Sequence, residues 1–284
     1  MELLQTYPWI WMVCAACLGL QFGSFLNLVI WRLPVMLHRQ WEDEVAEFQG
    51  HTVPARQTFN LSSPASHCTH CMTPLRAIDL VPVLSFLWLK GRCHHCHAKV
   101  SWRYPLVELT VAAWWAWCAA HWGVSPAALA WSGFGTVLLA LALIDSDTML
   151  LPDSMTLPLL WIGMVLSALG WINVGLTDSL WGAVAGYLSL WVVQAVFKLI
   201  TGKQGMGQGD FKLLAALGAW LGWLALPAVV LVASLLGVLM ALVMRWRGSL
   251  ASDQAFPFGP YLAFAGILMA VFEPALMFSH RFVY

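Results

Sequence analysis

Long apolar segments dominate the chain, and polar residues gather in a few stretches between them. An α-helix needs about 20 apolar residues to cross the hydrocarbon core of a bilayer, and most of the apolar segments approach this length. They lack the alternation of apolar and polar positions that is typical of a half-buried strand. The pattern predicts helices of membrane-spanning length at 7–33, 104–122, 126–146, 154–172, 178–200, 210–226, 227–246 and 258–279. Around Pro227, one kinked re-entrant segment is the alternative to two short helices.

The composition supports this interpretation. Of the 284 residues, 60% are hydrophobic and 10% are charged, whereas soluble domains are about 45–50% apolar and about 25% charged. A soluble globular protein and a disordered chain are therefore excluded. Basic and acidic residues are equal in number, so we expect no nucleic acid among the partners. The predicted fold class is an all-α polytopic membrane protein with about eight transmembrane helices embedded in the lipid bilayer.

The basic residues orient these helices. Of the 14 Lys and Arg residues, 13 flank the loops at 34–103, 201–209 and 247–257, and only Arg281 falls on the other side. Because basic residues favour the cytoplasmic side of a membrane, these loops are predicted to be cytoplasmic and both termini to lie outside. We interpret the first apolar segment as a retained helix, since no basic residue precedes it and further spans follow.

The long polar loop at 34–103 carries a pattern of metal ligands. Cys68 and Cys71 form one Cys-x-x-Cys pair, and Cys93 and Cys96 form a second pair after 21 intervening residues. Two such pairs suit tetrahedral Zn²⁺. Two disulfides are the alternative, but cytoplasmic thiols stay reduced. We predict a small cytoplasmic zinc-binding loop domain, in which four thiolates leave the ion no open position for catalysis.

Several carboxylates lie at membrane depth, where an ionisable group is expensive and therefore a functional candidate. Asp145 and Asp147 end the third predicted helix, and Asp210 opens the sixth after the glycine-rich segment 205–209. Repeated glycines favour irregular backbone that a substrate can approach closely. Two facing carboxyls do not both ionise easily, so one can act as an acid while the other activates water. This is the chemistry of an aspartic protease.

Other polar residues and glycines in the spans have structural interpretations. Asp153 follows Pro152 at the start of a helix, where an N-cap is expected. Lys212 is expected to extend its amine to the membrane surface. Gly19 and Gly23 form a Gly-x-x-x-Gly pattern, which favours close packing of the first helix against a neighbour.

With Gly207-Gln208-Gly209-Asp210 identified, the chain resembles the GxGD-type membrane aspartic proteases, and more closely the bacterial type IV prepilin leader peptidases. The further motifs of this resemblance are Gly23-Ser24-Phe25-Leu26-Asn27, Arg32-Leu33-Pro34, the tandem Cys-x-x-Cys pairs, Asp79-Leu80-Val81-Pro82-Val83-Leu84-Ser85, Arg103-Tyr104-Pro105 with Glu108, and Asp145 seven residues before Pro152. The resemblance implies that Asp145 and Asp210 are the catalytic pair. Asp147 is the fallback for the first of them, because the Asp-x-Asp spacing allows either alignment.

The resemblance also implies a bifunctional enzyme of the cell inner membrane. Such an enzyme would cut the basic leader of prepilins and pseudopilins after a Gly at the cytoplasmic face. It would then methylate the new N-terminal residue, using S-adenosylmethionine as methyl donor. The expected domains are a first transmembrane helix at 1–33, the zinc loop at 34–103 and a transmembrane peptidase core at 104–284.

The methyl-donor site is not evident from the residues, since no glycine-rich nucleotide-binding loop follows a predicted strand. Asn27, Arg32, Arg103 and Glu108 are weak candidates, because they are polar and lie at the cytoplasmic ends of the first two spans. Hydrogen bonds between packed helices would explain the same residues equally well.

Two other classes of protein compete with the protease. In a transporter or channel, buried carboxylates relay ions and a glycine-rich turn interrupts a helix. The carboxylates here gather on one face and no inverted repeat is visible, which disfavours that class. A zinc enzyme is disfavoured by the closed set of four thiolates.

Overall fold

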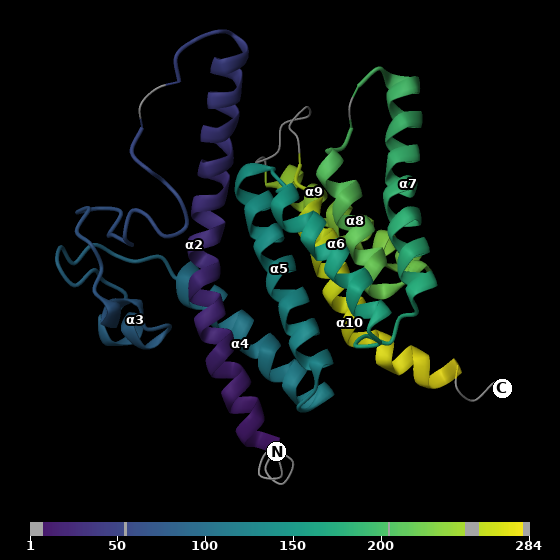
Figure 1. The fold of residues 1–284 in the computed structure, drawn as a ribbon, viewed down its shortest axis with the longest axis horizontal. Coiled ribbons are helices and arrows are strands. Elements are labelled where there is room, and N and C mark those ends of the chain that lie inside the picture. The colour runs from purple at the N-terminus through teal and green to yellow at the C-terminus, as the bar shows by residue number, and fades with distance from the viewer. Residues whose placement is uncertain (1–7, 54–55, 204, 248–255, 281–284) are drawn as a thin grey trace. The chain divides into compact units, whose positions relative to one another are not determined.

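The computed structural model describes residues 8–53, 56–203, 205–247 and 256–280. Within these ranges the secondary structure is helical, apart from two isolated β-bridges, as the all-α prediction requires (Figure 1). The chain forms two compact units, Met1–Thr136 and Val137–Tyr284. The boundary between them falls within helix α5 (Pro126–Thr148). Arg281, the basic residue expected on the outer side, lies outside the described residues.

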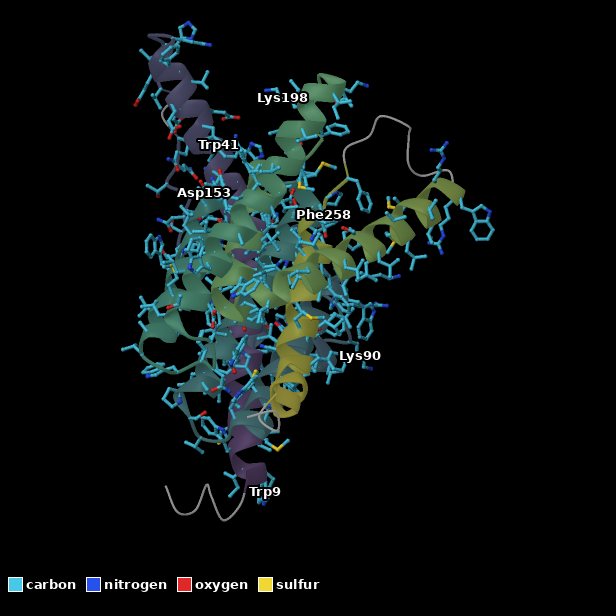
Figure 2. All side chains as sticks on the ribbon, turned by 90° about the vertical axis from the view of Figure 1, so that its right-hand side faces the viewer. Trp9, Trp41, Lys90, Asp153, Lys198 and Phe258 are labelled. Carbon is cyan, nitrogen blue, oxygen red and sulfur yellow. The ribbon has the colours of Figure 1, made fainter. Side chains whose placement is uncertain are left out.

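In the first unit, α2 (Pro8–Phe48) is a single helix of 41 residues. It continues past Leu33, where the first span was predicted to end, and includes Pro34. The helix tolerates this proline, and the residues that follow are mostly good helix formers. At 1.5 Å per residue, α2 is about 60 Å long, roughly twice the hydrocarbon thickness of a bilayer. Figure 2 shows Trp9 near one end of this helix and Trp41 toward the other.

Helix α4 (Arg103–Trp122) packs closely against α2. A Cβ atom at Gly19 would lie 2.8 Å from the Cα of Ala112, and one at Gly23 would lie 2.7 Å from the Cα of Glu108. Real Cβ atoms do not approach other atoms so closely, so only glycine permits this helix separation. The packing predicted for Gly19 and Gly23 is confirmed.

Between α2 and α4 the chain forms the polar loop of the first unit. It contains the 3₁₀ helix η1 (Ala77–Leu80), the short helix α3 (Leu84–Trp88) and two β-bridges, which join His67 to Pro74 and Arg92 to Lys99. Each bridge encloses one of the Cys-x-x-Cys pairs. The loop therefore has local structure of its own at both pairs.

The second unit is a helical bundle whose most enclosed member is α8 (Gln208–Leu221). Helix α8 contacts α6 (Asp153–Ala168), α7 (Leu176–Thr201) and α10 (Gly259–His280). The 3₁₀ helix η2 (Trp223–Ala225) separates α8 from α9 (Leu226–Trp246). The chain thus forms two helices around Pro227, as predicted, because Gly222 breaks the path with a φ of +79°.

Glycines and one tryptophan fix the packing of α8. Gly182 of α7 and Gly218 of α8 lie backbone to backbone, and a Cβ atom on either would collide with the carbonyl of the other. The ring of Trp220 is fully buried, and its Nε1 donates a hydrogen bond of 2.8 Å to the Leu159 carbonyl of α6. The helix is therefore held at defined positions on two sides.

Four of the described helices are long and apolar enough to cross a membrane: Trp9–Phe48, Pro126–Thr148, Leu176–Thr201 and Trp223–Trp246. Asp153–Ala168 and Gly259–Phe272 are apolar but shorter. Helices occur at all eight predicted positions, and the four long ones support an association with membranes. Whether all eight cross the bilayer remains a prediction.

Candidate active site and metal centre

Asp145 lies in the last turn of α5 and is buried, with 5% of its surface exposed. Its Oδ2 accepts a hydrogen bond of 2.9 Å from the backbone N–H of Gly259, the first residue of α10. Sequence reasoning did not identify Gly259 as part of this site. The only available signal was its position between Phe258 and Pro260 at the start of a predicted helix.

Asp210 lies in the first turn of α8 and is also buried, with 7% of its surface exposed. Its Oδ1 has no hydrogen-bond partner among the described residues. Helix α8 already begins at Gln208, with Gly207 as its N-cap. The irregular backbone predicted over 205–209 therefore ends at Gly207. The free N–H groups and dipole of a helix N-terminus favour a carboxylate there.

Leu151 connects the surroundings of the two acids within the second unit, because it contacts Gly209, which precedes Asp210, and Gly259, whose N–H binds Asp145. Leu151 lies in the connection between α5 and α6. A Cβ atom added to Gly209 would lie 2.7 Å from the Leu151 side chain, and one added to Gly259 would lie 3.2 Å from it. These glycines let α8 and α10 approach the same leucine. Because the two acids come from α5 and α8, no local sequence pattern could show that they face each other.

The neighbouring acids have different surroundings. Asp147 is exposed, because residues two apart on a helix point to nearly opposite sides. Asp153 was predicted to be an N-cap, but this was wrong: the N-cap position belongs to Pro152. Both carboxylate oxygens of Asp153 instead accept hydrogen bonds of 2.7 Å from the Nζ of Lys212. Lys212 therefore links α8 to α6, and its role as a membrane anchor stays a prediction.

In the first unit, the four loop cysteines form one cluster. The Sγ atoms of Cys68, Cys71, Cys93 and Cys96 all lie within 4.8 Å of one another. The Sγ atoms of Cys68 and Cys96 are 3.8 Å apart, and a tetrahedral zinc site with Zn–S bonds of about 2.3 Å would separate its sulfurs by about 3.8 Å. None of the described cysteines is in a disulfide.

The two Cys-x-x-Cys pairs fold in the same way. The first cysteine of each pair, Cys68 or Cys93, accepts a hydrogen bond of 3.4 Å on its Sγ from the N–H two residues later. Its own N–H donates to the carbonyl five residues later, and the residue after each pair, Met72 or His97, has a φ of 57°. N–H donors to sulfur stabilise thiolates. Matched turns that aim four sulfurs at one point fit Zn²⁺.

The four candidates for the methyl-donor site all lie in the first unit. Asn27 Nδ2 donates a hydrogen bond of 3.1 Å to the Tyr104 carbonyl. Arg32 is buried at 3% exposure, and Glu108 is buried beside Gly23. Asn27, Arg32 and Glu108 all line one cavity of this unit, whereas Arg103 is exposed on the surface. The structure therefore groups three of the four candidates.

Two family models match the chain. The bacterial peptidase A24 N-terminal domain matches residues 17–122, and the type IV leader peptidase family matches residues 132–242. The matched regions include the cysteine cluster and Asp145 and Asp210, respectively. These matches define the class of protein as a family A24 peptidase, and the transporter and zinc-enzyme alternatives lose their support.

Curated relatives agree along nearly the whole chain. The prepilin leader peptidase/N-methyltransferase of Stutzerimonas stutzeri is 48% identical over 266 residues, covering 93% of this chain and 92% of the relative. The proteins of the same name from Aeromonas hydrophila and Pseudomonas putida are 48% and 49% identical, covering 94% and 93% of this chain and 92% and 91% of the relatives. No solved structure matches the chain. The chain belongs to the type IV leader peptidase family, which confirms the family predicted from its motifs.

Proposed function

We propose that this protein cleaves the leader peptide of type IV prepilins and pseudopilins after a Gly, using Asp145 and Asp210, and then N-methylates the new N-terminal residue with S-adenosylmethionine. The family assignment and the names of the relatives support the two activities. The observation that carries the catalytic assignment is the pair of buried carboxylates from α5 and α8, one of which keeps an unpartnered oxygen.

The chemistry of the pair follows from its surroundings. Two carboxylates that repel each other in a buried site favour a state in which they share one proton. The ionised carboxyl takes a proton from a water molecule, whose oxygen attacks the carbonyl carbon of the leader Gly. The protonated carboxyl donates its proton toward the substrate as the peptide C–N bond breaks. The N–H of Gly259 keeps Asp145 oriented during these transfers.

The methylation step needs a donor that the chain does not itself contain. When bound, S-adenosylmethionine would supply an electrophilic methyl group on its sulfonium for transfer to the neutral N-terminal amine. The residues of the chain must hold the donor and the new N-terminus together. Asn27, Arg32, Arg103 and Glu108 are the proposed candidates for that role.

The metal proposal is a structural Zn²⁺ held by Cys68, Cys71, Cys93 and Cys96. The matched turns and sulfur separations support it, and a four-thiolate set leaves no open coordination position. Because the unfolded loop offers no preformed site, binding of the ion stabilises the folded loop.

For the membrane, we propose that the helices at all eight predicted positions cross the cell inner membrane, with the 34–103 loop and the catalytic acids on the cytoplasmic face. The distribution of basic residues supports this orientation. The 14 residues of α8 span only about 21 Å, so this helix depends on its neighbours for burial, and α6, α7 and α10 pack around it.

The test is leader cleavage of a prepilin in membranes that contain wild-type protein, Asp145→Asn, Asp147→Asn or Asp210→Asn. Electrophoretic mobility reports cleavage, and the mass of the new N-terminus reports methylation. We expect Asp145→Asn and Asp210→Asn each to lose cleavage while the matched Asp147→Asn variant retains it. Cleavage that survives Asp210→Asn, or that needs Asp147 instead of Asp145, would refute the proposed pair.

A further inference from the structure

The side chain of Leu151 lies beside the acids of the second unit and is partly exposed. The Cβ position of Gly259 is 2.7 Å from Asp145 Oδ2 and 3.2 Å from Leu151 Cδ1, so these two atoms lie at most 5.9 Å apart. The Cβ position of Gly209 is 2.7 Å from Leu151 Cβ and 3.2 Å from its Cδ1. One branched apolar side chain therefore lies next to Asp145 and next to the residue that precedes Asp210.

The connection that carries Leu151 is held at both ends. At one end, Met149 has a φ of 56°, and its N–H donates a hydrogen bond of 2.8 Å to the Asp145 carbonyl. At the other end, Pro152 is buried, and its carbonyl accepts a hydrogen bond of 3.0 Å from the N–H of Thr156. A residue that precedes a proline is restricted to extended backbone. The backbone of Leu151 is therefore fixed, and its side chain stays directed toward the acids.

Peptide cleavage would bring the substrate close to this leucine. The carbonyl carbon that reacts must come within about 3–3.5 Å of the attacking water, which the two acids activate in the proposed mechanism. The Cβ atom of the residue that carries this carbonyl lies only about 2.5 Å from the carbonyl carbon. A side chain at that position would therefore meet Leu151, whereas a glycine brings only hydrogen atoms there.

We infer that Leu151 selects glycine at the cleavage point, because its side chain occupies the space that a larger residue before the scissile bond needs. The inference rests on the proposed cleavage after Gly and names the residue that restricts the substrate. Leu151 has no proton to transfer, so its role is to determine specificity. One methylene group in an apolar pocket changes kcat/KM by about 10- to 200-fold. We expect discrimination of this order against alanine, and stronger discrimination against valine.

The test compares three prepilins, whose leaders end in Gly, Ala or Val, as substrates of the purified full-length protein in detergent. Leu151→Ala removes as many carbon atoms from the site as a valine side chain contains. We expect this variant to raise the Val-to-Gly ratio of kcat/KM about tenfold or more above the wild-type value or detection limit. The matched control is Leu157→Ala, the same change at a residue of α6 that is 39% exposed. The control should keep the wild-type ratio.

The ratio separates substrate selection from structural support. If Leu151 only stabilised the surrounding backbone, its loss would lower the cleavage of every prepilin by the same factor. The ratio would then stay constant, because both substrates meet the same fraction of folded enzyme. An unchanged ratio in Leu151→Ala would therefore overturn the inference.

A second variant decides the question if Leu151→Ala fails to fold. Leu151→Val removes a single carbon atom and should raise the Ala-to-Gly ratio about tenfold; an unchanged ratio would again overturn the inference. A wild-type protein that cleaves all three prepilins equally well would refute selection by Leu151 and leave the proposed cleavage intact. A wild-type protein that cleaves none of them would refute the proposed function itself.

Discussion

The contact between Gly259 and Asp145 allows a sharp test of the catalytic geometry through the substitution Gly259→Ala. A Cβ atom at this position would lie 2.7 Å from Oδ2 and 3.2 Å from Cγ of Asp145. Ordinary contacts of a Cβ begin near 3.4 Å, so the nearest pair must separate by 3.4 − 2.7, or about 0.7 Å. A displacement of about 1 Å from productive geometry can lower a rate about 100-fold. We therefore expect the kcat/KM of leader cleavage to fall about 10- to 100-fold.

The assay is steady-state cleavage of a prepilin by purified protein, with Gly237→Ala as the matched control. Gly237 lies on α9, and a Cβ there would meet Tyr261 at 3.7 Å and Phe258 at 3.8 Å, which are ordinary contacts. The control should retain cleavage within about twofold, since the added methyl group would make only ordinary van der Waals contacts. If Gly259→Ala, folded as judged by thermal unfolding, cleaves as fast as the control, the assigned role of the Gly259–Asp145 contact is wrong.

Three further predictions concern the supports of the two units. The double variant Cys68→Ser/Cys71→Ser should lose bound zinc in elemental analysis, and its loop should become sensitive to proteolysis before leader cleavage of prepilin is abolished. Full zinc occupancy would exclude the four-thiolate site. Gly182→Ala forces a Cβ atom into the backbone of α8 and should lower the free energy of unfolding by about 1–3 kcal/mol. An unchanged thermal midpoint would contradict the close packing of α7 against α8. A double-mutant cycle between Lys212 and Asp153 should give a coupling of less than about 1 kcal/mol, because the pair is partly exposed, and a coupling well above that would show that solvent does not screen it.

The sequence predicted features that depend on neighbouring residues. Apolar runs of membrane-spanning length located all eight helices, and Gly19 and Gly23 indicated the close contact of α2 with α4. Local patterns failed where another preference won, which was local at Pro34 and tertiary at Asp153. A helix was expected to stop before Pro34, but helix-forming residues on both sides carry α2 through it. Asp153 was expected to cap α6, but a lysine from α8 draws it into an ion pair.

By itself, the sequence determined the class of fold and the membrane-type composition, because both follow from the length and number of apolar segments. It also determined the two Cys-x-x-Cys turns, because each depends on spacing within a short segment. Only the tertiary structure showed that Asp145 is buried and Asp147 exposed, since burial depends on which helix covers which side of α5. The tertiary structure also supplied the N–H of Gly259, the unpartnered oxygen of Asp210 and the cavity between α2, the loop and α4. These features arise where segments distant in the chain meet, and no pattern along one segment records such a meeting.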